Sequence, residues 1–226
     1  MDFSVFEKRI GLTFKNIALL TQAFTHRSYL NENRAMRMEH NERLEFLGDA
    51  ILEFVVSEVI YNKFSDQEEG YLTALRAKIV NTVSLAAVAQ KMDLGKHIFL
   101  SKGEEETGGR TNTSLLADTV ESIIGAIFID GGLLESRKFI ENNILDNLDI
   151  ISREPLKDPK SLLQEEVQSK GYPTPKYIVV KEAGPDHEKT FSFEVEVGGE
   201  RLGTGTGKSK SEAAQNAAKD ALTKSL

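Results

Sequence analysis

The sequence predicts a two-part chain, with an all-α region over residues 1–150, a linker over 151–157 and a small α+β module over 158–226. Three observations support this fold class. The first region carries apolar residues at helical spacing and no alternating strand pattern. A polar stretch with two prolines follows at 152–159. Residues 190–197 (TFSFEVEV) then alternate in the manner of a half-buried strand.

Helices are expected in the first region at 3–10, 16–24, 42–63, 70–92, 113–130 and 133–148. The glycine-rich segment 103–112 is expected to be a loop. In the second region, Asp158 or Ser161 can cap a helix that ends near residue 170. The strands are expected at 176–181, 190–197 and 201–205, with a tight hairpin at Gly198-Gly199, and an alanine-rich helix at 209–224. The order helix, three strands, helix is typical of an α+β module.

Composition narrows the possible functions. The chain has 226 residues, 40% of them hydrophobic, so it can bury a core. It contains no long apolar run, so no membrane span is expected, and its start lacks a basic and then apolar leader, so no signal peptide is expected. It also contains no cysteine, which excludes disulfides and thiolate metal sites and fits a cytoplasmic protein.

Charge is unevenly distributed along the chain. Residues 1–150 carry the whole net charge of −7, residues 151–226 are neutral, and the last 26 residues have three more bases than acids. An acidic site that holds cations, joined to a locally basic end, is compatible with a polyanionic substrate.

Acidic residues recur at helical spacing within aliphatic sequence. Glu42, Glu45 and Asp49 are three and four residues apart, and Asp118 and Glu121 are again three apart. Solvated helix faces would be the ordinary explanation for either segment alone. Two such segments favour converging carboxylates that bind Mg²⁺ or Mn²⁺. Spacing alone leaves Glu53 open as a further ligand, because it shares a stripe with Asp49. Glu69 is a lone acid in a third segment.

Other chemistries find less support. None of the four histidines forms a zinc-protease or di-iron pattern; His26 and His97 are expected to serve local structure, and His40 to cap a helix or contact a dimer partner. The segment GTGTGKS at 203–209 fails the spacing of an ATP-binding P-loop, so its glycines are expected to serve a turn and no nucleotide cofactor is expected.

Motifs across nearly the whole chain resemble the ribonuclease III family, in that family's domain order. The segments NERLEFLGD at 41–49, EEGYLTALRAKIV at 68–80 and ADTVESIIGAIFID at 117–130 are similar to its catalytic domain. Three further segments resemble a double-stranded-RNA-binding domain: LLQEEVQSKG at 162–171, GPDHEKTFSFEV at 184–195 and GTGTGKSKSEAAQNAAKDAL at 203–222.

The resemblance implies a Mg²⁺-dependent endoribonuclease that acts on double-stranded RNA as a homodimer, each subunit cutting one strand. Its products would carry 5′-phosphate and 3′-hydroxyl ends with a short 3′ overhang, and its substrates would include ribosomal RNA precursors and other structured RNAs. By resemblance, the metal ligands are Glu45, Asp49, Asp118 and Glu121, and Asp49 and Glu121 among them are catalytic. Glu42 and Glu69 match accessory acids, while Glu53 matches no ligand position.

The resemblance also assigns RNA-binding positions in the second region. They are Ser161, Gln164, Gln168, His187, Lys208 and Lys210. Each would ordinarily be an unremarkable solvated residue. The family often has two adjacent lysines where this chain has Lys210-Ser211, which predicts a phosphate site weaker by one charge.

Three rival functions remain to be separated from cleavage of duplex RNA. The main alternative is a regulator that binds double-stranded RNA without cutting it, which the intact acidic segments disfavour. A helical metalloprotein acting on small phosphates would leave the second module without a purpose. Specificity for single strands is disfavoured because no cluster of aromatic stacking residues is present.

Overall fold

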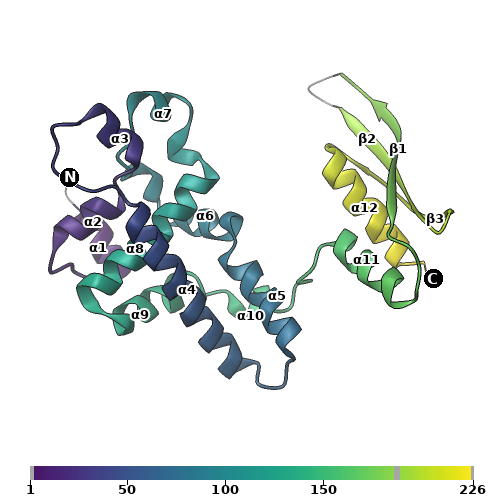
Figure 1. Ribbon diagram of the computed structural model, residues 1–226, viewed down its shortest axis with the longest axis horizontal. Helices are drawn as coiled ribbons and strands as arrows, with labels where there is room; N and C mark the ends of the chain where they lie inside the picture. The colour runs from purple at the N-terminus through teal and green to yellow at the C-terminus, as the bar shows by residue number, and fades with distance from the viewer. Residues whose placement is uncertain (1–2, 186–188, 225–226) are drawn as a thin grey trace. The chain divides into compact units, whose positions relative to one another are not determined.

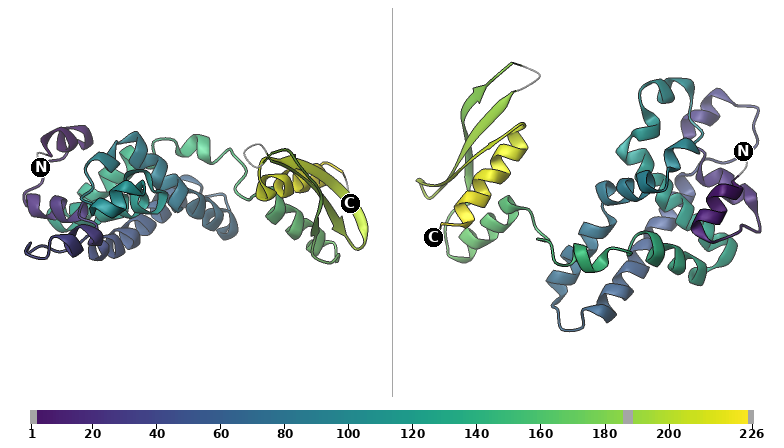
Figure 2. Two further views of the ribbon diagram at one scale, coloured as in Figure 1. Left: turned by 90° about the horizontal axis from the view of Figure 1, so that it is seen from above. Right: turned by 180° about the vertical axis from the view of Figure 1, so that it is seen from behind.

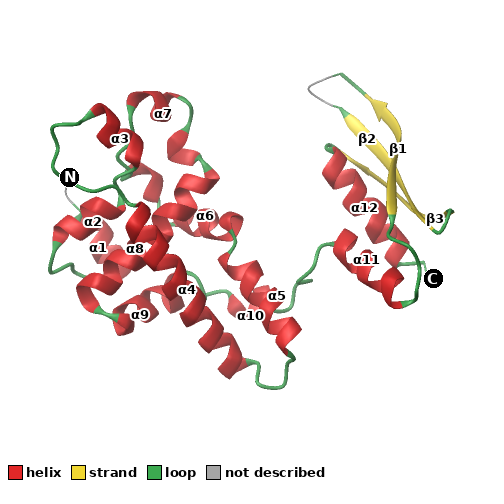
Figure 3. Cartoon of the chain, in the orientation of Figure 1, coloured by secondary structure: helices red, strands yellow, loops and turns green. Residues whose placement is uncertain are grey.

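The computed structural model describes residues 3–185 and 189–224, and the chain divides into two compact units, Met1–Glu154 and Pro155–Leu226. The first unit is helical, and within the described residues the strands of the sheet belong to the second unit (Figure 3). The predicted fold class is therefore confirmed. Within the described residues, no single helix is long and apolar enough to cross a bilayer; the bent pair of helices Glu69–Val80 and Thr82–Lys91 meets that test on length and composition alone.

The first unit is built around helix α8, Thr113–Gly131, whose middle turns are buried. Its Val120, Ile123, Ile124 and Ile127 have no exposed surface. Helix α4 packs along α8, and α2, α6 and α9 also contact it (Figure 1). The helices of this unit are α1 Ser4–Ile10, α2 Ile17–Ala23, α3 Arg27–Glu32, α4 Glu42–Lys63, α5 Glu69–Val80, α6 Thr82–Lys91, α7 Lys102–Glu106, α8 Thr113–Gly131, α9 Leu133–Asn143 and α10 Leu148–Ile151.

The predicted helix 70–92 is wrong, because two helices occupy this stretch and meet at a 45° bend. Asn81 makes the break. Its backbone is extended, and its side chain caps α6 by accepting a hydrogen bond from the Ser84 N–H at 2.9 Å. A capped start of this kind ends the preceding helix without glycine or proline.

Other boundaries also differ from the prediction. The predicted loop 103–112 contains α7, which the Ser101 side chain caps, and a short 3₁₀ turn at Gly109–Thr111. Helix α9 ends at Asn143, and α10 forms a separate turn of helix at Leu148–Ile151. Helix α3 is absent from the predicted elements; the His26 side chain caps it.

The second unit has the predicted order of helix, three strands and helix. Its elements are α11 Pro159–Ser169, β1 Lys176–Ala183, β2 Thr190–Val197, β3 Glu200–Gly207 and α12 Lys210–Leu222. The strands form one antiparallel sheet in the order β1-β2-β3, and the helices cover one face of it (Figure 2). The core joins Leu163 and Val167 of α11 to inward-facing Phe193, Val195 and Val197 of β2 and to the alanines of α12.

The glycines of GTGTGKS lie in strand β3, so the expectation that they serve a turn is wrong. A Cβ on Gly205 would lie 2.1 Å from the Ala217 backbone nitrogen, and one on Gly203 would lie 2.5 Å from the Ala217 carbonyl oxygen. Helix α12 thus packs with its backbone almost against the strand. Glycine on β3 and alanine on α12 are the residues that permit this distance.

Candidate functional site

Helices α4 and α8 cross with their backbones in contact. A Cβ on Gly48 of α4 would lie 1.8 Å from the Glu121 carbonyl oxygen. A Cβ on Gly125 of α8 would lie 2.2 Å from the Leu44 carbonyl oxygen. Only glycine therefore fits at these two positions. The crossing brings the acid-bearing faces of the two helices together, because each glycine is within one turn of an acidic residue.

Glu45, Asp118 and Glu121 form an acidic cluster at this crossing. Each offers one carboxylate oxygen, and the three oxygens lie within 4.8 Å of one another. All three side chains are half-buried. Asp49 is exposed, one turn beyond Glu45, and is not part of this close group. Its negative charge nevertheless acts on Glu121, so it lies at the edge of the acidic cluster.

Burial raises the pKa of Glu121 to about 8, and the charges of Asp49, Asp118 and Glu45 contribute in the same direction. Burial likewise raises the pKa of Glu45 and of Asp118 above their usual range. Without a cation, Glu121 is therefore protonated at neutral pH. Carboxylate oxygens this close are the donor set that hard divalent cations prefer, so the acidic cluster fits Mg²⁺ or Mn²⁺.

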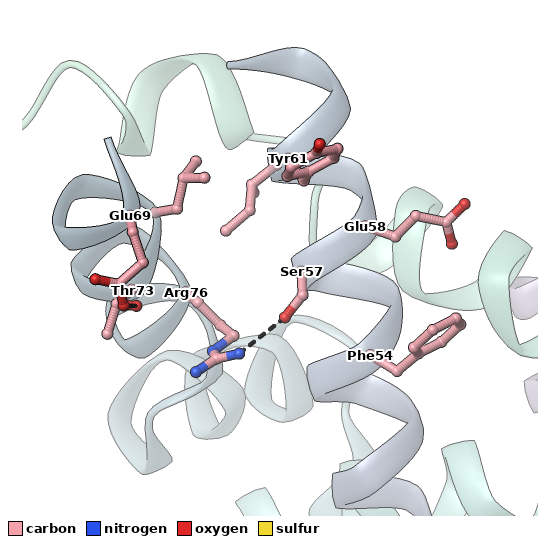
Figure 4. A pocket seen from close by; sticks show the side chains of 9 residues that line it. Phe54, Ser57, Glu58, Tyr61, Glu69, Thr73 and Arg76 are labelled. Atoms are coloured by element: carbon pink, nitrogen blue, oxygen red, sulfur yellow. Dashed lines mark hydrogen bonds between the residues drawn. The ribbon is translucent and has the colours of Figure 1, made fainter. Parts of the chain in front are cut away.

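The two accessory acids lie outside the acidic cluster. Glu42 is exposed at the start of α4, where its carboxylate is 3.2 Å from the Arg27 guanidinium and 3.8 Å from His40 Nδ1. Glu69 begins α5 and lines a groove beside Tyr61 of α4 (Figure 4). At 1.5 Å per residue, Tyr61 is about 24 Å along α4 from Glu45. Glu69 therefore does not join the acidic cluster of its own subunit. Glu53 is exposed on α4.

The histidines have structural surroundings. His26 Nδ1 lies 2.8 Å from Ser28 Oγ and caps α3, and burial lowers its pKa although Glu104, Glu42 and Asp118 act in the opposite direction. His97 packs against Phe3, Phe6 and Phe24. The His40 side chain does not cap α4, because its Nδ1 has no hydrogen-bond partner.

The predicted RNA-binding residues of the second unit are mostly exposed. Gln164 and Gln168 are exposed one turn apart on α11, while the Ser161 hydroxyl donates to Asp158 at 2.7 Å. Lys208 is exposed just before α12. Lys210 Nζ lies 2.7 Å from Glu182 and 5.5 Å from the centre of the Phe191 ring. His187 lies outside the described residues.

Sequence reasoning missed the role of Gly48 and Gly125. A signal was present, because each glycine stands inside a long helix, where it costs about 1 kcal/mol relative to alanine. An unexplained glycine within a helix indicates close backbone approach. The Arg27–Glu42 pair was also missed, and no spacing rule connects these two residues.

The protein thus joins a helical unit, whose acidic cluster fits a divalent cation, to a compact α+β unit. The family model described as Ribonuclease-III-like matches residues 16–148, and the one described as Double-stranded RNA binding motif matches residues 159–225. The chain therefore belongs to the ribonuclease III family, and this membership makes it an endoribonuclease.

Individual relatives agree with this assignment. The chain is 45% identical to Ribonuclease 3 of Natranaerobius thermophilus over 99% of its own length and 96% of the relative. It is 44% identical to Ribonuclease 3 of Protochlamydia amoebophila over 96% of its own length and 90% of the relative. The first unit resembles a solved nuclease domain of ribonuclease III from Campylobacter jejuni, with a TM-score of 0.58 and 38% identity over 64% of this chain and 99% of that one.

Proposed function

We propose that the chain hydrolyses phosphodiester bonds of double-stranded RNA at the acidic cluster, with Mg²⁺ or Mn²⁺ held by Glu45, Asp118 and Glu121 and with Asp49 completing the ligand set. The observation that carries this proposal is the convergence of three half-buried carboxylates within 4.8 Å. The pKa of about 8 for Glu121 supports it, because the charged form of the acidic cluster requires a cation.

When bound, a divalent ion acidifies water and neutralises the charge that develops on the phosphorus centre. The chain's own residues hold the ligands in place for that chemistry. Asp118 and Glu121 share one rigid helix, and Glu45 reaches them from the other side of the glycine crossing. The buried Ser122 hydroxyl donates to the Asp118 carbonyl of its own helix at 2.7 Å and lies 3.4 Å from the carbonyl of Asn41, the residue that precedes α4. A fixed arrangement of this kind needs little reorganisation during reaction.

The second unit is proposed to hold the duplex. RNA helices are recognised mainly by shape, over about 16 base pairs per module of this type. Gln164 and Gln168 are available for contacts with 2′-hydroxyl groups or base edges, and Ser161 and His187 remain proposals by resemblance. Lys208 and Lys210 flank the start of α12, where the helix dipole also favours phosphate.

The active form is proposed to be a homodimer in which each subunit cuts one strand. Helix α4 exposes Phe46, Phe54 and Tyr61 to 81%, 54% and 68%. Phe54 and Tyr61 line the groove between α4 and α5, together with Leu72 and Arg76 (Figure 4). Aromatic residues this exposed mark an interaction surface. The solved Campylobacter jejuni nuclease domain is described as flexible in a region involved in dimer formation. Glu69, on the edge of this groove, is proposed to serve the paired sites.

The products are proposed to carry 5′-phosphate and 3′-hydroxyl ends with a short 3′ overhang, in the cytoplasmic processing of ribosomal RNA precursors and other structured RNAs. The test is a cleavage assay on end-labelled duplex RNA, run with Mg²⁺, with Mn²⁺ and with EDTA. We expect cleavage with either metal and none with EDTA. Binding without cleavage in both metals would instead favour the non-cleaving regulator.

A further inference from the structure

The last residues of the first unit are held by side chains from α4 and α5. Lys63 Nζ of α4 lies 2.8 Å from Asp149 of α10. The Tyr71 hydroxyl of α5 donates to the Ser152 carbonyl at 3.3 Å. Lys78 Nζ of α5 lies 2.8 Å from the Glu154 carboxylate and 3.5 Å from the Ile151 carbonyl. Helix α10 is thus fastened beside α5 up to the final residue of the unit (Figure 1).

These contacts occupy one face of α5. Tyr71 and Lys78 are seven residues apart, so they share a face at about 100° per residue. Glu69 and Arg76 are also seven apart and face the groove, where Arg76 donates to Ser57 Oγ at 3.0 Å (Figure 4). The two pairs lie about 180° apart around the helix axis. One short helix therefore faces the proposed dimer groove on one side and holds the exit segment on the other.

The connection beyond Glu154 is short. Residues 155–157 alone separate it from Asp158, whose carboxylate caps α11 and accepts a hydrogen bond from Gln215. Four residue steps span at most about 14 Å when fully extended. If the anchor were released back to Leu148, whose side chain is buried, ten steps would span about 35 Å. The position at which the chain leaves the first unit therefore decides how far the second unit can move.

We propose that Lys63, Tyr71 and Lys78 form an anchor that fixes the pivot of the RNA-binding unit to α5. The anchor thereby sets the distance along the duplex between the bound segment and the cut, and these three are positioning residues that determine cleavage-site specificity. This inference rests on the proposed function. For an intramolecular encounter, the effective concentration falls roughly as the −3/2 power of tether length, so release from four to ten steps lowers it about fourfold.

Charge reversal within the Lys78–Glu154 pair tests the anchor in the full-length protein. Glu154→Lys and Lys78→Glu each break the pair, and the double variant Lys78→Glu/Glu154→Lys restores the ion pair with the charges exchanged, without the bond that Lys78 donates to the Ile151 carbonyl. The Glu154 side chain is 57% exposed, so its replacement leaves the core intact. Lys138→Glu is the matched control, because it breaks an exposed pair with Glu135 on α9.

Two measurements are made on each variant. Fluorescence energy transfer between one dye on α9 and another on α12 should show a broader distance distribution in each single variant, and partial recovery in the double variant. On a hairpin with one preferred cut, the single variants should spread cleavage over neighbouring positions and raise KM about twofold at unchanged kcat, because Tyr71 still holds Ser152 and the tether lengthens only from four to six steps. Lys138→Glu should match the wild type in both.

The two measurements separate the anchor from the proposed function. Wild-type distances and a wild-type cut position in both single variants would overturn the anchor. Broad distances with an unchanged cut position would overturn its role in specificity. Failure of the wild type to cut duplex RNA would refute the proposed function, while the distance measurement would still decide whether the anchor holds.

Discussion

Both units bring two backbones together through glycine, yet they present their functional residues in opposite ways. In the first unit, Gly48 and Gly125 let two helices touch, and the result is a half-buried group of like charges. In the second unit, Gly203 and Gly205 let a helix rest on a strand, and those candidate RNA-binding residues that the structure describes are exposed to water.

The contrast follows from what each site has to do. Metal ligands must be fixed relative to one another before the substrate arrives, which requires burial and raises the pKa values of the carboxylates. Contacts with a duplex are spread over many base pairs and are read by shape, so flexible exposed side chains suffice. Cleavage should therefore fall sharply when a single atom of the acidic cluster is changed. Duplex binding should instead weaken gradually as residues of the RNA-binding surface are replaced.

Glu121→Gln should give the largest effect. It removes one charge from the acidic cluster and keeps the shape of the side chain, so we expect a loss of cleavage on the order of 10²–10³-fold with Mg²⁺. Binding of duplex RNA in a gel assay should change little, because the second unit is untouched. Glu53→Gln is the control, since it removes an exposed acid from the same face of α4. Normal cleavage by the Glu121 variant would end the proposed assignment.

Gly125→Ala should separate the two crossing helices. Its Cβ would lie 2.2 Å from the Leu44 carbonyl oxygen, and the overlap should cost about 1–3 kcal/mol of unfolding free energy. Thermal unfolding measures this as a lower Tm, by roughly 2–4 °C for each kcal/mol in a chain of this size. The cleavage rate should fall by more than the unfolded fraction explains, because the carboxylates move apart.

The control for that substitution is Gly103→Ala, where a Cβ would meet no atom within 4 Å.

The matching change in the other unit is Gly205→Ala, where the Cβ would lie 2.1 Å from the Ala217 nitrogen. It should abolish duplex binding by disrupting the second unit while the acidic cluster stays intact. Equal effects of Gly103→Ala and Gly125→Ala would show that the glycine crossing is not required.

Glu121 should also make the metal-free protein less stable as pH rises. Its pKa is raised from 4.5 to about 8, so between these values the folded chain keeps a proton that the unfolded chain has lost. The unfolding free energy must therefore fall from pH 4.5 to pH 8 and become constant above. Glu121→Gln should have the higher Tm at pH 8 in EDTA, by a few degrees. Mg²⁺ should raise the Tm of the wild type and leave the Tm of the variant almost unchanged. A difference in Tm between wild type and variant that does not change with pH in EDTA would contradict this account.

The sequence predicted what depends on local pattern and not what depends on three-dimensional placement. The long helix at 42–63 was predicted to the residue, because its apolar and acidic residues recur at helical spacing. The break at Asn81 was missed because its capping role depends on the backbone turning there. The separation of Glu69 from the acidic cluster was invisible for a similar reason. The spacing of acidic residues shows which of them share a face of one helix. The direction in which α5 leaves α4 is set by packing, which the spacing does not show.

Lys208 and Lys210 should give the smallest effect and the clearest contrast between the units. Replacing each by alanine should weaken duplex binding for every sequence alike and reduce the slope of log affinity against log salt by about one unit per lost phosphate contact. Lys210 should contribute less than Lys208, because its ammonium group must first leave Glu182, whose pKa it lowers by hydrogen bonding, and the face of Phe191.

Glu182→Gln sharpens this comparison, because it frees Lys210 without removing it. That variant should bind duplex RNA slightly more tightly than the wild type, and a filter-binding titration at several salt concentrations measures all three variants. An unchanged salt slope in both lysine variants would show that neither contacts phosphate. Tighter binding by Glu182→Gln together with an unchanged cleavage rate at saturating RNA would show that the exposed surface can be tuned without altering the acidic cluster.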